Sequence, residues 1–197
     1  MKAVKSLELR KVKEDIDFKH INFNSPGVEL NILGDNFNSN SVIVFNQGSI
    51  EKDLVINGHN RKIKELRLVD CLVKKTVFIF NLQVEKIKIN GDIKNIILTN
   101  VDFQRLNIKG NIYRMLILDN LINKNSKIVI EGKINGIVFR NVETYLLNLE
   151  NTDCNFIKGQ KLKVKKLLVP SGKASFKKIT INHLSLIKKI KTKIITA

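Results

Sequence analysis

Apolar residues recur along most of the chain at alternating positions, in short runs that each end in Asn, Asp or Gly. The segments 87–91, 106–110 and 128–132 all contain an aliphatic residue, a variable residue, Ile, a polar or charged residue and Gly. Alternation at i and i+2 sends the aliphatic side chains to one face of a strand. Gly and Asn accept the left-handed backbone of a tight corner. The repeating unit is therefore predicted to be a short strand followed by a turn.

The turn residue itself alternates between two types in the middle of the chain. In order along the chain, these turns are Gly91, Asn100, Gly110, Asn120, Gly132 and Asn141. Two kinds of corner double the period to about 20 residues, and a fixed period of that length is typical of a solenoid. We therefore predict an all-β fold in which residues 28–182 form a β-solenoid, a parallel β-helix with coils of about 20 residues. An antiparallel β-meander is the alternative, because Asn57-Gly58 and Asn90-Gly91 are also good hairpin turns.

Both ends of the chain depart from this pattern. Solenoids need caps, since an open end exposes strand edges that template aggregation. We predict that residues 1–27 form an N-terminal cap and that residues 183–197 form a basic C-terminal cap or tail. The spacing of apolar residues in this last segment fits an amphipathic helix, whereas its β-branched content fits a strand. A basic amphipathic helix could also lie on a membrane or in a partner groove, but a cap over the solenoid is the favoured role.

Positive charge is concentrated at the C-terminal end of the chain. The formal net charge is +17, and no Asp or Glu follows Asp153. Uncompensated positive charge repels itself, and an anionic partner relieves that repulsion. The alternative is that lysine is the default solvating residue of a chain rich in Lys, Asn and Ile, as in proteins encoded by AT-rich genomes. The lysines of this end are Lys158, Lys161, Lys163, Lys165, Lys166, Lys173, Lys177, Lys178, Lys188, Lys189, Lys191 and Lys193.

These lysines predict a binding surface for the nucleic-acid backbone. In a β-helix the equivalent positions of successive coils stack, so outward lysines can form a ladder along one side, and such a ladder suits a row of phosphates. Lys acts as a point charge, whereas Arg makes bidentate base contacts, so recognition by shape and charge is expected. We predict a protein that binds RNA, favoured over DNA, through the twelve lysines.

Aromatic residues that could stack on bases are few. Phe176 lies among the C-terminal lysines and is the one aromatic residue that we assign to the nucleic-acid site. Phe156, Tyr113 and Tyr145 are further candidates, but at strand positions we expect each of them to lie in the core.

Nothing in the sequence indicates catalysis. The carboxylates are scattered singly, so we expect no enzyme; a carbohydrate-active β-helix, which needs clustered carboxylates, is an alternative. His20, His59 and His183 lie far apart, and no Cys and His spacing fits zinc. We therefore expect no metal, no cofactor and no small-molecule substrate. Cys71 and Cys154 fit buried or free thiols, which suggests a reducing compartment.

The N-terminal residues contain no apolar stretch of the kind found in a signal peptide. No run of the chain approaches the ~18 apolar residues of a membrane span. We therefore expect a soluble, cytoplasmic protein, and secretion by a route that needs no signal peptide is the alternative.

Two segments carry a resemblance to a known family. Ile-Asn-Gly-Asp-Ile at 89–93 and Ile-Lys-Gly-Asn-Ile at 108–112 resemble the coils of bactofilins, which are polymer-forming β-helix proteins. That resemblance implies a structural, self-assembling scaffold as an alternative function. In its size, charge and composition the chain is also similar to phage-encoded inhibitors of host defence, including anti-CRISPR proteins. This second resemblance implies an inhibitor or modulator of a nucleoprotein machine such as a CRISPR effector.

Overall fold

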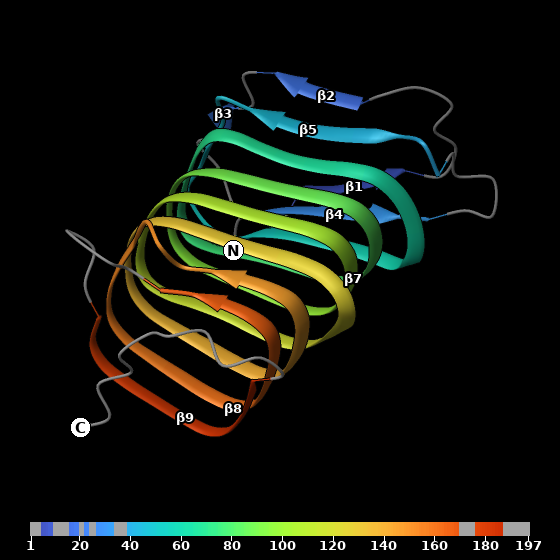
Figure 1. The fold of residues 1–197 in the computed structure, drawn as a ribbon. Coiled ribbons are helices and arrows are strands. Elements are labelled where there is room, and N and C mark those ends of the chain that lie inside the picture. The colour runs from blue at the N-terminus through green and yellow to red at the C-terminus, as the bar shows by residue number, and fades with distance from the viewer. Residues whose placement is uncertain are drawn as a thin grey trace.

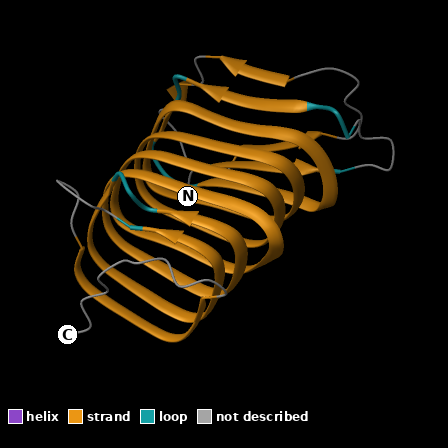
Figure 2. Cartoon of the chain, in the orientation of Figure 1, coloured by secondary structure: helices purple, strands orange, loops and turns teal. Residues whose placement is uncertain are grey.

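The structure, a computed structural model, is a β-solenoid of about six turns (Figure 1). It describes residues 5–9, 16–19, 22–23, 27–33, 39–169 and 176–186, and for the segments before residue 27 and after residue 169 it describes the backbone alone. These residues contain strands and turns and no helix (Figure 2). The strands are β1 (Lys5–Leu9), β2 (Ile16–Lys19), β3 (Asn22–Phe23), β4 (Val28–Ile32), β5 (Val42–Asn46), β6 (Ser49–Ile50), β7 (Leu54–Asn148), β8 (Thr152–Leu168) and β9 (Phe176–Leu186).

All pairing between the described strands is parallel. In the pairing of β7 with β8, Gly132 lies opposite Thr152 and Asn148 lies opposite Leu168, so both partners are 20 positions apart. The long strand β7 winds through several coils, because the parallel pairing with neighbouring coils continues on both sides of each corner, as at Arg140 with Gln160 and Val142 with Leu162. Parallel pairing at this offset confirms the predicted β-solenoid with coils of about 20 residues, and it excludes the antiparallel meander.

The interior of the solenoid is filled by the aliphatic residues of the alternating pattern. Leu66, Ile87, Leu106 and Ile128, from successive coils, are all 0% exposed. Each coil buries these side chains against the coils above and below, so the core is one continuous stack. The low aromatic content of the chain is thus compensated by repetition of Ile, Leu and Val.

The first kind of corner is built from asparagines in the left-handed conformation. Asn81, Asn100, Asn120 and Asn141 have φ angles between 49° and 52°, a region that Asn tolerates better than most residues. Each side-chain amide donates to the side-chain oxygen of the asparagine one coil earlier, at 3.4 Å from Asn100 to Asn81, 2.5 Å from Asn120 to Asn100 and 2.8 Å from Asn141 to Asn120. This ladder ties the coils together along one edge.

The second kind of corner is built from glycines that have no space for a side chain. A Cβ atom on Gly91 would lie 2.1 Å from the carbonyl oxygen of Cys71, one on Gly110 would lie 2.1 Å from that of Gly91, and one on Gly132 would lie 2.2 Å from that of Gly110. Their φ angles are 154°, 127° and 109°. The alternation of Gly and Asn in the sequence therefore marks two stacked columns of corners, which we call the glycine corner and the asparagine corner.

These corners divide each coil into two parts, which we call the first side and the second side, and each part bends again where two consecutive residues point away from the core, as at Gln104 and Arg105. The first side runs from the glycine corner to the asparagine corner, as in 92–99, 111–119 and 133–140. The second side runs from the asparagine corner to the next glycine corner, as in 82–90, 101–109 and 121–131.

The asparagine ladder ends at Lys161, which occupies the next corner with a φ of 56°. We expect Lys161→Asn to raise the free energy of unfolding by about 1 kcal/mol, because Asn accepts this conformation better and can extend the ladder by one hydrogen bond. Urea denaturation measures the change. Lys158→Asn removes an exposed lysine from a position without a positive φ and serves as the control. Equal stability of the two variants would contradict a stabilising role for the ladder.

The two ends of the chain continue the parallel pairing. Strands β1, β2 and β3, from the predicted cap 1–27, pair in parallel with β4, β5 and β6 respectively. At the other end β9 pairs in parallel with β8 and ends at Leu186, so residues 183–186 are strand. The remainder of the basic tail 183–197 lies outside the described residues, and the domain boundaries stay predictions.

Candidate nucleic-acid interface

The structure describes the side chains of five of the twelve predicted lysines, and all five are exposed. These are Lys158, Lys161, Lys163, Lys165 and Lys166. Lys177, Lys178 and Phe176 belong to β9, for which only the backbone is described. Lys173, Lys188, Lys189, Lys191 and Lys193 lie outside the described residues.

The five described lysines do not all lie on one surface. Lys163, Lys165 and Lys166 lie together on the second side of the solenoid, on strand β8. Lys158 lies on the first side, where its ammonium group is 5.7 Å from the centre of the Phe156 ring. Lys161 stands at the corner between them. The chain turns at Lys161, so lysines that are close in sequence are directed to different sides of the rod.

The second side carries a further row of basic residues from earlier coils. Lys86, Arg105 and Lys127 each come five positions before a residue of the glycine corner, namely Gly91, Gly110 and Gly132. Because these glycines stack on one another, the three cations occupy equivalent positions of three successive coils, a spacing of about 4.8 Å per coil. We call Lys86, Arg105 and Lys127 the basic column.

The charges of this column are close enough to affect one another. The side chain of Lys88 and partial burial lower the pKa of Lys86, and the positive charge of Arg105 contributes in the same direction. The carboxylate of Glu65 opposes this effect. The contributions of Lys88 and Arg105 to this lowered pKa are those expected of neighbouring positive charges.

One acid lies among these cations. The Glu65 carboxylate accepts a hydrogen bond from Arg67 at 2.5 Å and lies 3.5 Å from the ammonium group of Lys88 and 3.9 Å from that of Lys86. Burial raises the pKa of Glu65, but the three cations outweigh it and hold the pKa below its usual value. Glu65 is therefore ionised at neutral pH and offsets part of the charge at the N-terminal end of the basic column.

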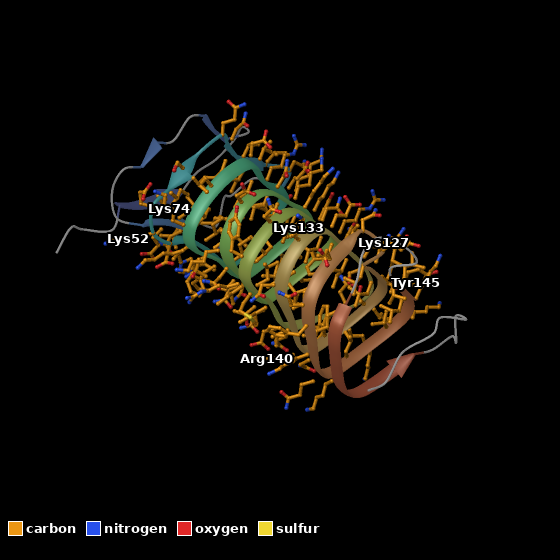
Figure 3. All side chains as sticks on the ribbon, turned by 90° about the vertical axis from the view of Figure 1, so that its left-hand side faces the viewer. Lys52, Lys74, Lys127, Lys133, Arg140 and Tyr145 are labelled. Carbon is orange, nitrogen blue, oxygen red and sulfur yellow. The ribbon has the colours of Figure 1, made fainter. Side chains whose placement is uncertain are left out.

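The lysines of β8 extend the positive surface toward the C-terminal end. The ammonium group of Lys165 lies 5.1 Å from the centre of the Tyr145 ring, and that of Lys163 lies 3.8 Å from the Glu143 carboxylate of the preceding coil. Figure 3 shows Tyr145 and Lys127 on the same edge of the rod, near this end. We call the basic column together with Lys88, Lys163, Lys165 and Lys166 the basic face.

The first side differs from the basic face, because its outward positions include an apolar column. Val55, Phe78, Ile97, Ile117 and Val138 are half-buried residues, each lying between two fully buried neighbours, so their side chains are directed outward. The column ends at Lys158, which is paired in register with Val138. A surface with an apolar centre is less suited to phosphate groups than the second side.

The structure corrects the expectation that Tyr113 and Tyr145 lie in the core. Tyr113 is 58% exposed and Tyr145 is 37% exposed, because both stand where the alternation breaks and two consecutive residues lie outside the core. Phe156 is half-buried, and its ring covers Gly136, where a Cβ atom would lie 2.2 Å from the ring. The basic column was not among the predicted site residues, and Tyr145, named as a candidate for stacking, was expected in the core. The recurrence of a basic residue five positions before each corner glycine is the sequence signal that could have identified the column.

The two cysteines are buried free thiols, as the sequence suggested. Burial is the main cause that raises the pKa of both thiols, and it raises the pKa of Cys154 to about 11. Both are therefore protonated at neutral pH and are poor nucleophiles.

Among the described residues, no three His, Cys, Asp or Glu side chains gather where they could hold a metal ion. The same part of the chain contains no helix with the length and apolar character needed to cross a membrane.

Comparison of this chain with protein-family models, with curated proteins and with solved structures gives no match.

Proposed function

We propose that this protein binds nucleic acid through the basic face, by contacts to phosphates and without enzymatic chemistry. The observation that supports this function best is the basic column, in which Lys86, Arg105 and Lys127 occupy equivalent positions of three stacked coils. The solenoid backbone holds these positions at a fixed spacing, so a bound strand meets an ordered row of cations. RNA is the favoured ligand, as the sequence predicts. By binding the RNA of a nucleoprotein machine, such as a CRISPR effector, this protein would inhibit or modulate that machine.

The basic face also indicates how selective this binding is. Of its seven residues only Arg105 has the planar donor group that reads base edges in a bidentate manner, and the other six are lysines. Phosphate contacts position a ligand but carry no sequence information directly. Weak sequence preference is therefore expected.

The salt dependence of RNA binding tests this function. If about six cations contact phosphates, log affinity falls against log salt with a slope of about −4 for a single strand, a loss of roughly 250-fold between about 50 and about 200 mM salt. Fluorescence anisotropy of a labelled oligonucleotide measures it, with DNA of the same sequence as the comparison. Absence of binding at low salt, or binding that salt does not weaken, would contradict the proposal.

A second candidate is the self-assembling scaffold, which the apolar column of the first side favours. Outward apolar residues on five successive coils offer a flat surface against which the same surface of a second copy could pack. Sedimentation velocity at rising protein concentration separates the two functions, with Ile97→Lys as the variant that disrupts the column. A monomer at all concentrations would exclude the scaffold and leave the nucleic-acid proposal unaffected.

A further inference from the structure

A depression on the second side brings an exposed aromatic ring together with three lysines. Tyr145 lines it with Lys124 of the preceding coil and with Lys163 and Lys165 of the following coil, and its volume is about 290 Å³. Glu143 also lines it and is paired with Lys163. The depression therefore lies at the C-terminal end of the basic face.

The depression arises from a difference in coil length. Gly91 and Gly110 are 19 positions apart, whereas Gly110 and Gly132 are 22 positions apart. The longer coil accommodates its additional residues in a turn at 123–126, where the Asn123 side-chain oxygen accepts a hydrogen bond from the Asn125 amide at 3.0 Å and the Ser126 hydroxyl donates to the Asn123 carbonyl at 2.7 Å. Lys124 and Asn125 of this turn line the depression together with Tyr145.

The residue before Tyr145, Thr144, contacts two backbone carbonyl oxygens through its hydroxyl. The buried hydroxyl of Thr144 lies 2.9 Å from the carbonyl oxygen of Ser126, in the preceding coil, and 3.2 Å from that of Leu146. Lys165 lies over the ring itself, in a cation–π contact of 5.1 Å. A cation therefore already lies beside the ring before any ligand binds.

We infer that Tyr145 is a stacking platform for an unpaired base of a single strand bound along the basic face. Base–aromatic stacking is tolerant of sequence, because every base has a π-face. The lysines around the ring are placed to contact the phosphates on either side of the stacked nucleotide. A duplex keeps its bases paired and stacked, so it gains the phosphate contacts alone. This inference rests on the proposed function and adds to it a preference for single strands.

The tyrosine content of the chain allows a direct test. The protein has two Tyr and no Trp, and Tyr113 lies on the first side, where burial and the nearby Asp92 carboxylate raise the pKa of its hydroxyl. In a Tyr113→Phe protein, Tyr145 is the one remaining tyrosine, so its fluorescence reports on this ring. We expect an oligouridylate of about twelve nucleotides to quench that fluorescence as it binds, and an RNA duplex of the same length to bind with much less quenching.

Two substitutions of Tyr145 measure how much its aromatic ring contributes to binding. We expect Tyr145→Leu to lower single-strand affinity about tenfold, with duplex affinity changed less than about twofold, and Tyr145→Phe to retain most of the affinity. Tyr113→Leu is the matched control and should change neither. Salt-dependent binding of both ligands with equal affinity and without quenching would overturn the stacking inference and leave the proposed function intact. Absence of binding of either ligand would overturn both. If Tyr145→Leu fails to fold, the quenching measurement decides alone.

Discussion

Replacing Lys86, Arg105 and Lys127 together with glutamate is expected to lower the affinity for RNA by about 100-fold or more at low salt. The substitution removes three cations from equivalent positions of successive coils and introduces three negative charges, which repel the phosphates. For a single strand, the loss of three phosphate contacts should reduce the magnitude of the salt slope by about 2. Anisotropy titrations of the triple variant at several salt concentrations measure both quantities.

A matched triple variant on the first side separates local contacts from overall charge. Lys52, Lys75 and Lys133 are exposed lysines of that side, and Figure 3 shows Lys52 and Lys133 away from the edge that carries Lys127 and Tyr145. Replacing these three with glutamate changes the net charge by the same amount. We expect a reduction of tenfold or less, about what weaker long-range attraction produces. An equal loss in the two triple variants would show that the basic face is not the binding surface.

The architecture could be predicted from the sequence, because it depends on local rules that repeat. Alternating aliphatic residues fix which side chains are buried, and the alternation of Gly110 and Asn120 marks two corners with different conformations. The same residues then stack in columns, as the contact between Gly110 and Gly91 shows. In a solenoid the same residues determine the local turn conformation and the stacking of the coils. A wrong assignment at one turn therefore does not change the prediction for the next coil.

The composition of the surface could not be predicted in the same way. A segment that lacks Asp and Glu in the sequence can still have carboxylates beside it on the surface, because the neighbouring coils come from positions about 20 residues away. Glu143, from the coil before the lysine-rich segment, lies 3.8 Å from Lys163. In addition, the chain turns at Lys161 and directs Lys158 to the other side. The basic face therefore draws its charge from several coils as well as from the C-terminal end.

The exposure of Tyr145 shows a second limit. Its own segment shows a break in the alternation, since Tyr145 and Leu146 both lie outside the core between the buried Thr144 and Leu147, but nothing in it indicates a depression. The depression forms because the preceding coil contains additional residues in the turn at 123–126. Variation in coil length, between 19 and 22 positions from one corner glycine to the next, is thus what makes one part of a regular solenoid different from the rest.

The glycine corner leads to the largest expected effect on stability. Gly110 has a φ of 127°, and a Cβ atom on it would lie 2.1 Å from the carbonyl oxygen of Gly91. We expect Gly110→Ala to lower the free energy of unfolding by about 3 kcal/mol or more, because the backbone strain and the clash act together. Each coil is stabilised by its neighbours, so a defect in a central coil weakens the stack in both directions. Thermal or urea unfolding followed by circular dichroism measures the loss.

The sign of this effect is as informative as its size. At a position with an ordinary conformation and open space, Gly→Ala stabilises a protein by about 0.4–1 kcal/mol, since it restricts the unfolded chain. Lys109→Ala, at the exposed residue just before Gly110, controls for a change at the same corner and should alter stability by less than about 0.5 kcal/mol. A Gly110→Ala protein as stable as the wild type would mean that successive coils do not stack glycine on glycine. The equivalence of Lys86, Arg105 and Lys127, which is counted from those glycines, would then be wrong as well.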